Sequence, residues 1–147
     1  MMISGSDFME TYKKSYKGLV FFLIGYMIAM FLPIFLPFED ANLLTRIVLN
    51  IATIGLVLLC RMMYRNERIY WINGISFEQA KRATSEQRKE YALWHLRQFG
   101  NAALIFFLFS ILAQYLHLSI ALDTIVMLVL LIAVAFRSVK VKLENFD

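Results

Sequence analysis

The stretch Gly18–Phe38, GLVFFLIGYMIAMFLPIFLPF, decides the class of fold to which this chain belongs. It contains no charged side chain from one end to the other. A helix of roughly 20 apolar residues, rising about 1.5 Å per residue, is long enough to cross the hydrocarbon core of a bilayer. A helix of a soluble bundle also needs a polar outer face, which this stretch lacks. The stretch therefore predicts a membrane-spanning helix.

Three more apolar stretches follow, each with at most one charged residue, which lies near an end: Leu43–Cys60, Gly100–Leu118 and Ile120–Phe136. The whole chain of 147 residues is 60% hydrophobic, and its mean hydropathy is +0.62. These values exceed those of typical soluble domains. We therefore predict a single all-α domain, residues 1–147, that folds as an integral membrane four-helix bundle.

The lysines and arginines predict how this bundle is oriented. Every basic residue except Arg46 lies before the first span, between the second and third spans, or after the fourth. Cytoplasmic segments close to membrane spans are enriched in Lys and Arg. We therefore expect both termini inside the cell, with residues 61–98 forming a short helical cytoplasmic segment between spans two and three.

The net charge indicates which partners the chain attracts, and the cysteine content excludes disulfide chemistry within the chain. The formal net charge of +4 comes from cations at the inner ends of the spans, where they attract anionic lipid headgroups rather than nucleic acid. Cys60 is the one cysteine, so the chain has no intramolecular disulfide and no CxxC redox pair. Multi-pass insertion with a lone cysteine fits a bacterial inner (plasma) membrane.

The segment 61–98 carries two helix-start signals. Each is a Ser or Thr followed three residues later by Gln, the capping-box pattern, at Ser76 and Gln79 and at Thr84 and Gln87. We expect the second span to continue as helix past the membrane, a short helix over Phe77–Ala83, and a longer one from Glu86 that runs into the third span.

Aromatic residues in this segment have two interpretations. Trp71, Tyr91 and Trp94 form either an aromatic belt at headgroup depth or a docking surface for a partner. His95, beside Trp94, has no nearby Cys or second His, and we expect it to be solvated. The segment shows no catalytic signature, no phosphate-binding glycine loop and no metal-ligand spacing, so we expect neither enzymatic activity nor a cofactor.

Polar residues inside the spans define the candidate site, because placing them in lipid is costly. They recur at helical spacing on spans two and three, and two open the fourth span. At the expected depths they meet in the outer half of the membrane, with Arg46 paired to Asp123. Such a cluster either holds helices together through hydrogen bonds or forms a small binding vestibule. Its members are Arg46, Asn50 and Thr53, then Ser110, Gln114 and His117, then Asp123 and Thr124.

Prolines and small residues indicate local features of spans one and two. Pro33 and Pro37 lack the N–H that a helix interior needs, so we expect the last turn of span one to kink or unwind. Small residues paired at helical spacing suit close helix packing, within the bundle or in a homodimer. The two pairs are Gly25 with Ala29 and Ala52 with Gly55.

Two functions from different classes fit this sequence. The first is a non-enzymatic integral membrane protein that acts as an accessory, regulatory or immunity-type subunit. As partners we expect the lipid bilayer together with a membrane protein or, in a homodimer, a second copy of the chain. The second is a small oligomeric transporter or pore that uses the outward-facing polar cluster. A carboxylate in the middle of a span, as proton-coupled exporters use, is absent from the sequence.

Overall fold

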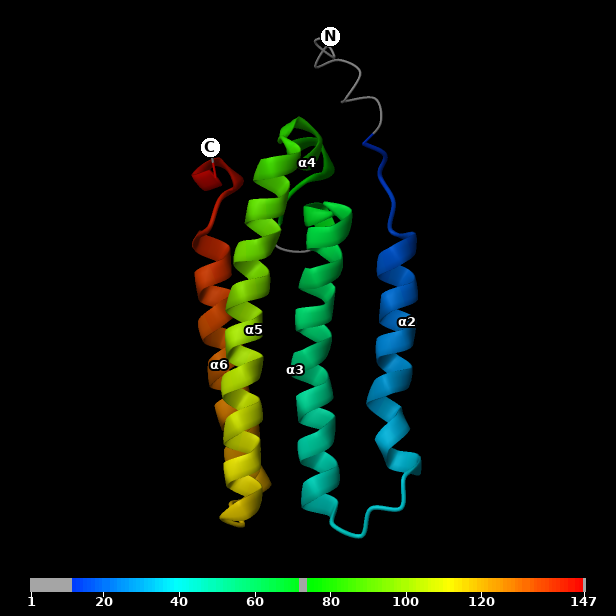
Figure 1. Cartoon of the computed structure of the whole chain (residues 1–147), viewed down its shortest axis with the longest axis vertical. Helices are drawn as coiled ribbons and strands as arrows, with labels where there is room; N and C mark the ends of the chain where they lie inside the picture. Colours follow the sequence, from blue (N-terminus) through cyan, green and yellow to red (C-terminus); the bar gives the residue numbers. More distant parts are fainter. Residues whose placement is uncertain (1–11, 72–73, 147) are drawn as a thin grey trace.

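The computed structural model of the chain describes residues 12–71 and 74–146, and these residues form helices and no strands. Four helices are long and apolar enough to cross a membrane, which confirms the all-helical prediction with four candidate spans. They lie side by side and run alternately up and down (Figure 1). In chain order the elements are α2 (Lys17–Phe31), η1 (Leu32–Phe35), α3 (Ala41–Asn66), η2 (Ile69–Trp71), α4 (Phe77–Arg82), α5 (Ser85–Tyr115), α6 (Ile120–Lys140) and η3 (Leu143–Phe146).

The first candidate span changes from α-helix to a 3₁₀ turn at its proline. α2 ends at Phe31, and η1 carries Pro33 among its first residues. Because proline has no N–H and clashes with the preceding turn, it stops the regular i to i−4 pattern. The expected unwinding of the last turn is therefore present.

The second span, α3, is longer than the apolar stretch that predicted it. Its N-cap is Asp40, whose Oδ1 accepts hydrogen bonds from the backbone N–H groups of Asn42 at 2.8 Å and Leu43 at 3.2 Å. It continues six residues past Cys60 to Asn66 and stops at Glu67, which has a left-handed backbone with φ of 56°. This confirms that the helix extends beyond the apolar stretch.

Both capping boxes are formed as the sequence predicts. Ser76 and Gln79 start α4, and Thr84 and Gln87 start α5, each with reciprocal side-chain-to-backbone bonds of 2.8–3.1 Å. α5 then runs without a break through the third apolar stretch to Tyr115. This confirms the expected helix that starts near Glu86 and runs into the third span, although α5 ends at Tyr115, three residues before the end of the stretch Gly100–Leu118.

The turn between α5 and α6 is closed by a residue in the left-handed region. His117 has φ of 54°, its N–H donates to the Gln114 carbonyl at 3.3 Å, and the Leu118 N–H donates to the Ala113 carbonyl at 2.9 Å. These two bonds make up a Schellman motif, which satisfies carbonyls at the end of a helix. α6 then returns antiparallel to α5 (Figure 1).

α3 occupies the central position among the four long helices. It contacts α2 on one side and both α5 and α6 on the other. The starts of α2 and α5, the ends of α3 and α6, and all of α4 lie at one end, here named the α4 end (Figure 1). The η1–α3 connection and the α5–α6 turn lie at the opposite end, named the Asp40 end. Successive long helices run in opposite directions, so the described chain segments before α2, between α3 and α5, and after α6 all lie at the α4 end. All basic residues except Arg46 therefore belong to the half of the molecule at this end.

α2 packs on α3 through one close contact. The Tyr26 ring lies so close to Gly55 that a Cβ at this position would overlap it, and the Tyr26 hydroxyl donates to the Ala52 carbonyl at 3.0 Å. The pair Ala52 and Gly55 thus serves packing within the chain. Gly25 has open space where a Cβ would stand, so none of the described residues packs closely against it.

The most enclosed packing lies at the α4 end and not midway along the spans. Six buried residues form its centre: Met63, Ile69, Tyr70, Ala80, Tyr91 and Ala92. In contrast, only 6% of the most apolar window in the first candidate span is buried, and 28% of that in α3. Helices that leave so much apolar surface uncovered are expected where lipid is the solvent.

Candidate functional site

Arg46 and Asp123 form the centre of a buried polar cluster near the Asp40 end. Arg46 Nη2 lies 3.0 Å from Asp123 Oδ2, and Arg46 Nε lies 3.3 Å and 3.2 Å from the two carboxylate oxygens. The Arg46 residue is 4% exposed and Asp123 is fully buried. α3 and α6 supply the two charges, each about one turn inside its helix, so the expected ion pair is present.

Further donors of the Arg46 guanidinium are also occupied. Nη1 donates to Gln114 Oε1 at 2.5 Å, and Nη2 donates to the Leu118 carbonyl at 2.6 Å. Both acceptors belong to the end of α5 and the turn that follows it. Arg46 therefore ties three long helices together at one point, with hydrogen bonds from each of its three guanidinium nitrogens.

Gln114 extends the cluster to the start of α3. Its Nε2 donates to Asp40 Oδ2 at 3.2 Å. This hydrogen bond, followed by those from the backbone N–H groups of Leu43 and Asn42, lowers the pKa of Asp40 below its ordinary value. Asp40 thus caps α3 with one carboxylate oxygen and holds α5 with the other.

Asn50 and Ser110 make a second contact between α3 and α5, one turn deeper. Asn50 Nδ2 donates to Ser110 Oγ at 2.9 Å and to the Arg46 carbonyl at 2.8 Å. Asn50 Oδ1 is buried and has no hydrogen-bond partner among residues 12–71 and 74–146. Among the described residues, the hydroxyls of Thr53 and Thr124 donate to carbonyls of their own helices, those of Asn50 and Ile120.

His117 does not join this cluster. The residue is exposed, and its part in the site comes from its backbone. Its left-handed conformation turns the chain so that the Leu118 carbonyl reaches Arg46. The expected place for the His117 side chain among the cluster residues is corrected, because helical spacing ends at Leu116, where α5 is capped.

A groove of about 570 Å³ runs along α3 and α5 beside the Arg46 cluster, which is defined as Arg46, Asn50, Ser110, Gln114 and Asp123. Four cluster residues line it, and its other walls are apolar. The groove is bordered by Arg46, Asn50, Ser110 and Gln114, and further by Leu43, Ile47, Ile51, Ile54, Phe107, Ile111 and Tyr115.

The three aromatic residues of the expected partner surface lie in different environments. Tyr91 is fully buried at the α4 end, with its ring 4.4 Å from that of His95. Trp71 is half-buried, and its Nε1 donates to the Ser15 carbonyl at 3.1 Å. Trp94 is half-buried on α5. A docking surface can use Trp71 and Trp94, whereas Tyr91 is part of the core, because its helix face turns toward η2 and η3.

His95 is buried, which corrects the expectation of a solvated histidine. It is fully enclosed, with Nδ1 at 2.8 Å from the Tyr91 carbonyl and Nε2 at 2.9 Å from Ser138 Oγ on α6. Sequence reasoning missed this α5–α6 contact. A usable signal was that His95 shares a helical face with Ala92 and Ala102, which are also buried.

A second ionic cluster at the α4 end was also missed. Glu67 Oε2 lies 2.8 Å from Arg88 Nη2, and Lys89 Nζ lies 3.5 Å from Glu67 Oε1, which also accepts from Ser85 Oγ at 2.7 Å. Burial acts to raise the pKa of Glu67, but the hydrogen bonds from Ser85 and Arg88 and the nearby cations outweigh it, so that the pKa is lowered. This cluster fastens the end of α3 to the start of α5.

Arg88 and Tyr12 close this cluster toward the N-terminal side. Arg88 is 2% exposed, donates to the carbonyls of Ala80 and Ala83, and lies 4.4 Å from the centre of the Tyr12 ring. The Tyr12 hydroxyl donates to the Glu67 carbonyl at 2.5 Å. Burial is the main reason that the pKa of Tyr12 rises to about 12, although Arg88 acts in the opposite direction.

The described residues include no group of three or more His, Cys, Asp or Glu side chains placed to hold a metal ion. Within those residues Cys60 is a buried free thiol on α3. In the Arg46 cluster and in the cluster around Glu67, the charged groups bind one another.

Comparison with protein-family models, with curated proteins and with solved structures finds no match to this chain. The class of the protein is therefore inferred from its own helices and not from a relative. Their lengths and hydropathies indicate a multi-pass membrane protein.

Proposed function

We propose that the four long helices form a membrane-spanning bundle with both termini in the cytosol. The distribution of basic residues supports this orientation, since all except Arg46 belong to the half of the molecule at the α4 end. The Asp40 end then faces outward and carries Glu39, Asp40 and Asp123. A bacterial plasma membrane, with anionic lipid in its inner leaflet, fits this charge asymmetry.

Within that membrane the chain acts as a non-enzymatic accessory, regulatory or immunity-type subunit. One observation carries this proposal: the buried charges of the spans are bound to each other. Arg46 donates to Asp123, Gln114 and Leu118 from all three guanidinium nitrogens. A transport site has to bind and release its substrate, whereas these contacts hold α3, α5 and α6 in one arrangement. They support a rigid scaffold that works through its surface.

The surface proposed for a membrane-protein partner lies at the α4 end, around Trp71 and Trp94. Both side chains are half-buried and belong to different elements, η2 and α5. Partly exposed tryptophans are common anchors in protein interfaces. Trp71 follows α3 by a few residues, and Trp94 lies in the polar first part of α5, so both positions also suit the membrane interface.

Purification of the full chain from its own membrane in mild detergent tests this function. A stoichiometric second protein that is lost from the Trp94→Ala variant, with an unchanged thermal unfolding midpoint, supports an accessory subunit. Tyr91→Ala serves as the control for destabilisation, because Tyr91 is fully buried and its removal lowers the midpoint. A homo-oligomer with no second protein contradicts the accessory role.

The second candidate function is a small oligomeric transporter or pore. The groove of about 570 Å³ beside the Arg46 cluster favours it, because the groove joins apolar walls to polar groups. Reconstituted vesicles that contain this chain alone would then release a trapped ion or small solute, and Ser110→Ala would change the rate. Tight vesicles contradict this candidate.

A further inference from the structure

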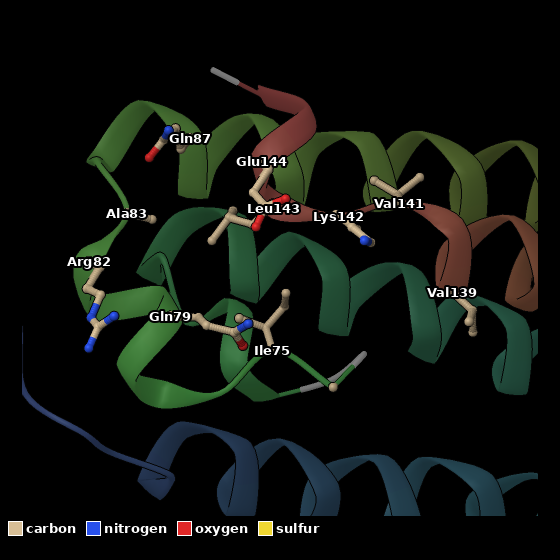
Figure 2. Close-up of a pocket in the computed structure, with 11 residues that line it drawn as sticks. Ile75, Gln79, Arg82, Ala83, Gln87, Val139, Val141, Lys142, Leu143 and Glu144 are labelled. Carbon is tan, nitrogen blue, oxygen red and sulfur yellow. The ribbon is translucent and has the colours of Figure 1, made fainter.

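A cavity of about 530 Å³ opens at the α4 end, and neither Arg46, Asp123, Glu67 nor Arg88 lines it (Figure 2). α4 and the α4–α5 turn form one side of it, with Gln79 and Arg82. The end of α6 and the segment after it form the other side, with Val139, Lys142 and Glu144. Two parts of the chain that are far apart in sequence thus share one cavity.

The side chains of the two cations that line this cavity form no ion pair with the described residues. These two residues, Arg82 and Lys142, are exposed. Arg88 and Lys89, by contrast, are both bound to Glu67. Glu144 is the one acidic residue in the lining, so the cavity has two positive charges and one negative charge.

Gln79 adds a neutral hydrogen-bond donor whose orientation is set by the fold. Its Oε1 accepts from the Ser76 N–H at 2.9 Å in the capping box of α4. This bond uses the oxygen of the amide and leaves the NH₂ group without a partner among the described residues. Figure 2 shows the end of the Gln79 side chain beside Ile75, with Leu143 on the other side of the cavity.

An apolar wall places the cavity at the boundary of the membrane. Val139 is 83% exposed and lies next to the last residue of α6, a candidate span. Val141 and Ile75 line the cavity as well. A ligand that satisfies both sides needs an anionic head for the cations and the amide, and an apolar part that continues along the outside of α6.

We propose that this cavity binds the phosphodiester headgroup of an anionic phospholipid, with Lys142 and the Gln79 amide as its donors and with Arg82, at the outer edge of the cavity, as a second cation that attracts the headgroup. The acyl chains then lie along Val139 and the exposed surface of α6. Cationic pockets at the cytoplasmic ends of membrane helices bind such headgroups. This proposal rests on the orientation proposed above, which places the α4 end at the inner leaflet.

Native mass spectrometry of the full chain in detergent, titrated with phosphatidylglycerol or phosphatidylcholine, tests this site. We expect the wild-type chain to bind phosphatidylglycerol more tightly than phosphatidylcholine. Arg82→Gln with Lys142→Gln should weaken phosphatidylglycerol binding by about tenfold or more. Lys13→Gln with Lys14→Gln removes the same charge from the same end, outside the cavity, and should change the binding less than about twofold.

Gln79→Glu gives an independent test that keeps the helix cap. A carboxylate at this position of the capping box also accepts from the Ser76 N–H, so helix content measured by circular dichroism should not change. The new negative charge should weaken phosphatidylglycerol binding as strongly as the double variant does. Unchanged binding in this variant overturns the assignment of Gln79 to the headgroup.

Three results overturn the lipid site as a whole. These are equal affinity for the two lipids, equal loss in the Lys13 and Lys14 control, and displacement of the lipid by inorganic phosphate, which would assign the cavity to a soluble anion. Lipid binding measured in detergent does not depend on how the chain is oriented in the membrane, and reporter fusions measure orientation without lipid binding. A failure of the lipid site and a failure of the proposed orientation can therefore be told apart.

Discussion

Arg46 and Asp123 are 77 positions apart in the chain, and Arg46 Nη2 lies 3.0 Å from Asp123 Oδ2 in a fully buried contact. Removal of one partner leaves the other as an uncompensated charge where water is scarce. Asp123→Asn and Arg46→Gln should therefore each lower the free energy of unfolding by about 3 kcal/mol. Thermal or denaturant unfolding in detergent measures both effects.

The double variant is the control for this pair. Because both charges are then absent, Arg46→Gln with Asp123→Asn should cost clearly less than the sum of the two single effects. If the single effects simply add, the two side chains do not stabilise each other, and the Arg46 cluster loses its centre.

Glu67 makes stability depend on pH at the α4 end. The pKa of Glu67 is lowered in the folded chain, so its contribution is complete above the ordinary glutamate pKa and is lost as pH falls through the folded value. We expect the wild-type chain to lose stability as the pH falls below the ordinary glutamate pKa of 4.5. In Glu67→Gln this part of the pH profile should be flatter, with neutral-pH stability lower by about 2 kcal/mol.

The matched control for Glu67 is Glu86→Gln. Glu86 is exposed near the start of the same helix that carries Arg88, and it makes no ion pair within the described residues. A pH profile altered as strongly by Glu86→Gln would show that general charge, and not the Glu67–Arg88 contact, is responsible.

The hydrogen bond between His95 and Ser138 joins α5 to α6 inside the protein. Ser138→Ala removes the partner of His95 Nε2 and should cost about 1–2 kcal/mol, because a buried polar atom is left unpaired. Ser119→Ala is the control, since the Ser119 side chain makes no capping bond although it precedes α6. Equal midpoints for Ser138→Ala and the wild type would contradict this role.

His117 should be replaceable by glycine with a gain in stability. Its left-handed backbone, with φ of 54°, costs a non-glycine residue about 1 kcal/mol, and its side chain is exposed. We expect His117→Gly to raise the unfolding midpoint and to preserve the Schellman turn. A lower midpoint would indicate that the imidazole itself has a binding or packing function.

Reporters fused at loop positions test the proposed orientation. Fusions after Phe38 and His117, which lie at the Asp40 end, should report outside, and a fusion after Arg82 should report inside. A fusion after Asp147, which lies outside the described residues, should also report inside. An external signal after Arg82 would reverse the orientation and place the lipid cavity at the outer leaflet.

The sequence alone determined the class of this protein and the ends of several helices. Apolar runs such as Gly18–Phe38 have one low-energy solution in lipid, a helix that satisfies its own backbone, so four candidate spans follow from hydropathy. Helix starts at Ser76 and Thr84 were predictable for a similar reason. A capping box needs only residues three positions apart, and both partners are present in the local sequence.

Part of the Arg46 cluster was also within reach of the sequence. Helical spacing and matched depth predicted that Arg46, Asn50, Ser110 and Gln114 would meet near Asp123, and the structure brings these five together. His117 was misplaced, because spacing alone does not show that α5 stops at Tyr115 and that a left-handed turn follows.

Only the tertiary structure decided which polar groups became buried partners across long separations. His95 and Ser138 are 43 positions apart, and Glu67 and Arg88 are 21 apart. Neither pair has a spacing that one helix imposes. Their contacts depend on how α3, α5 and α6 are rotated and shifted against one another. Side-chain packing sets that rotation, whereas a linear pattern reports only the face on which each residue lies.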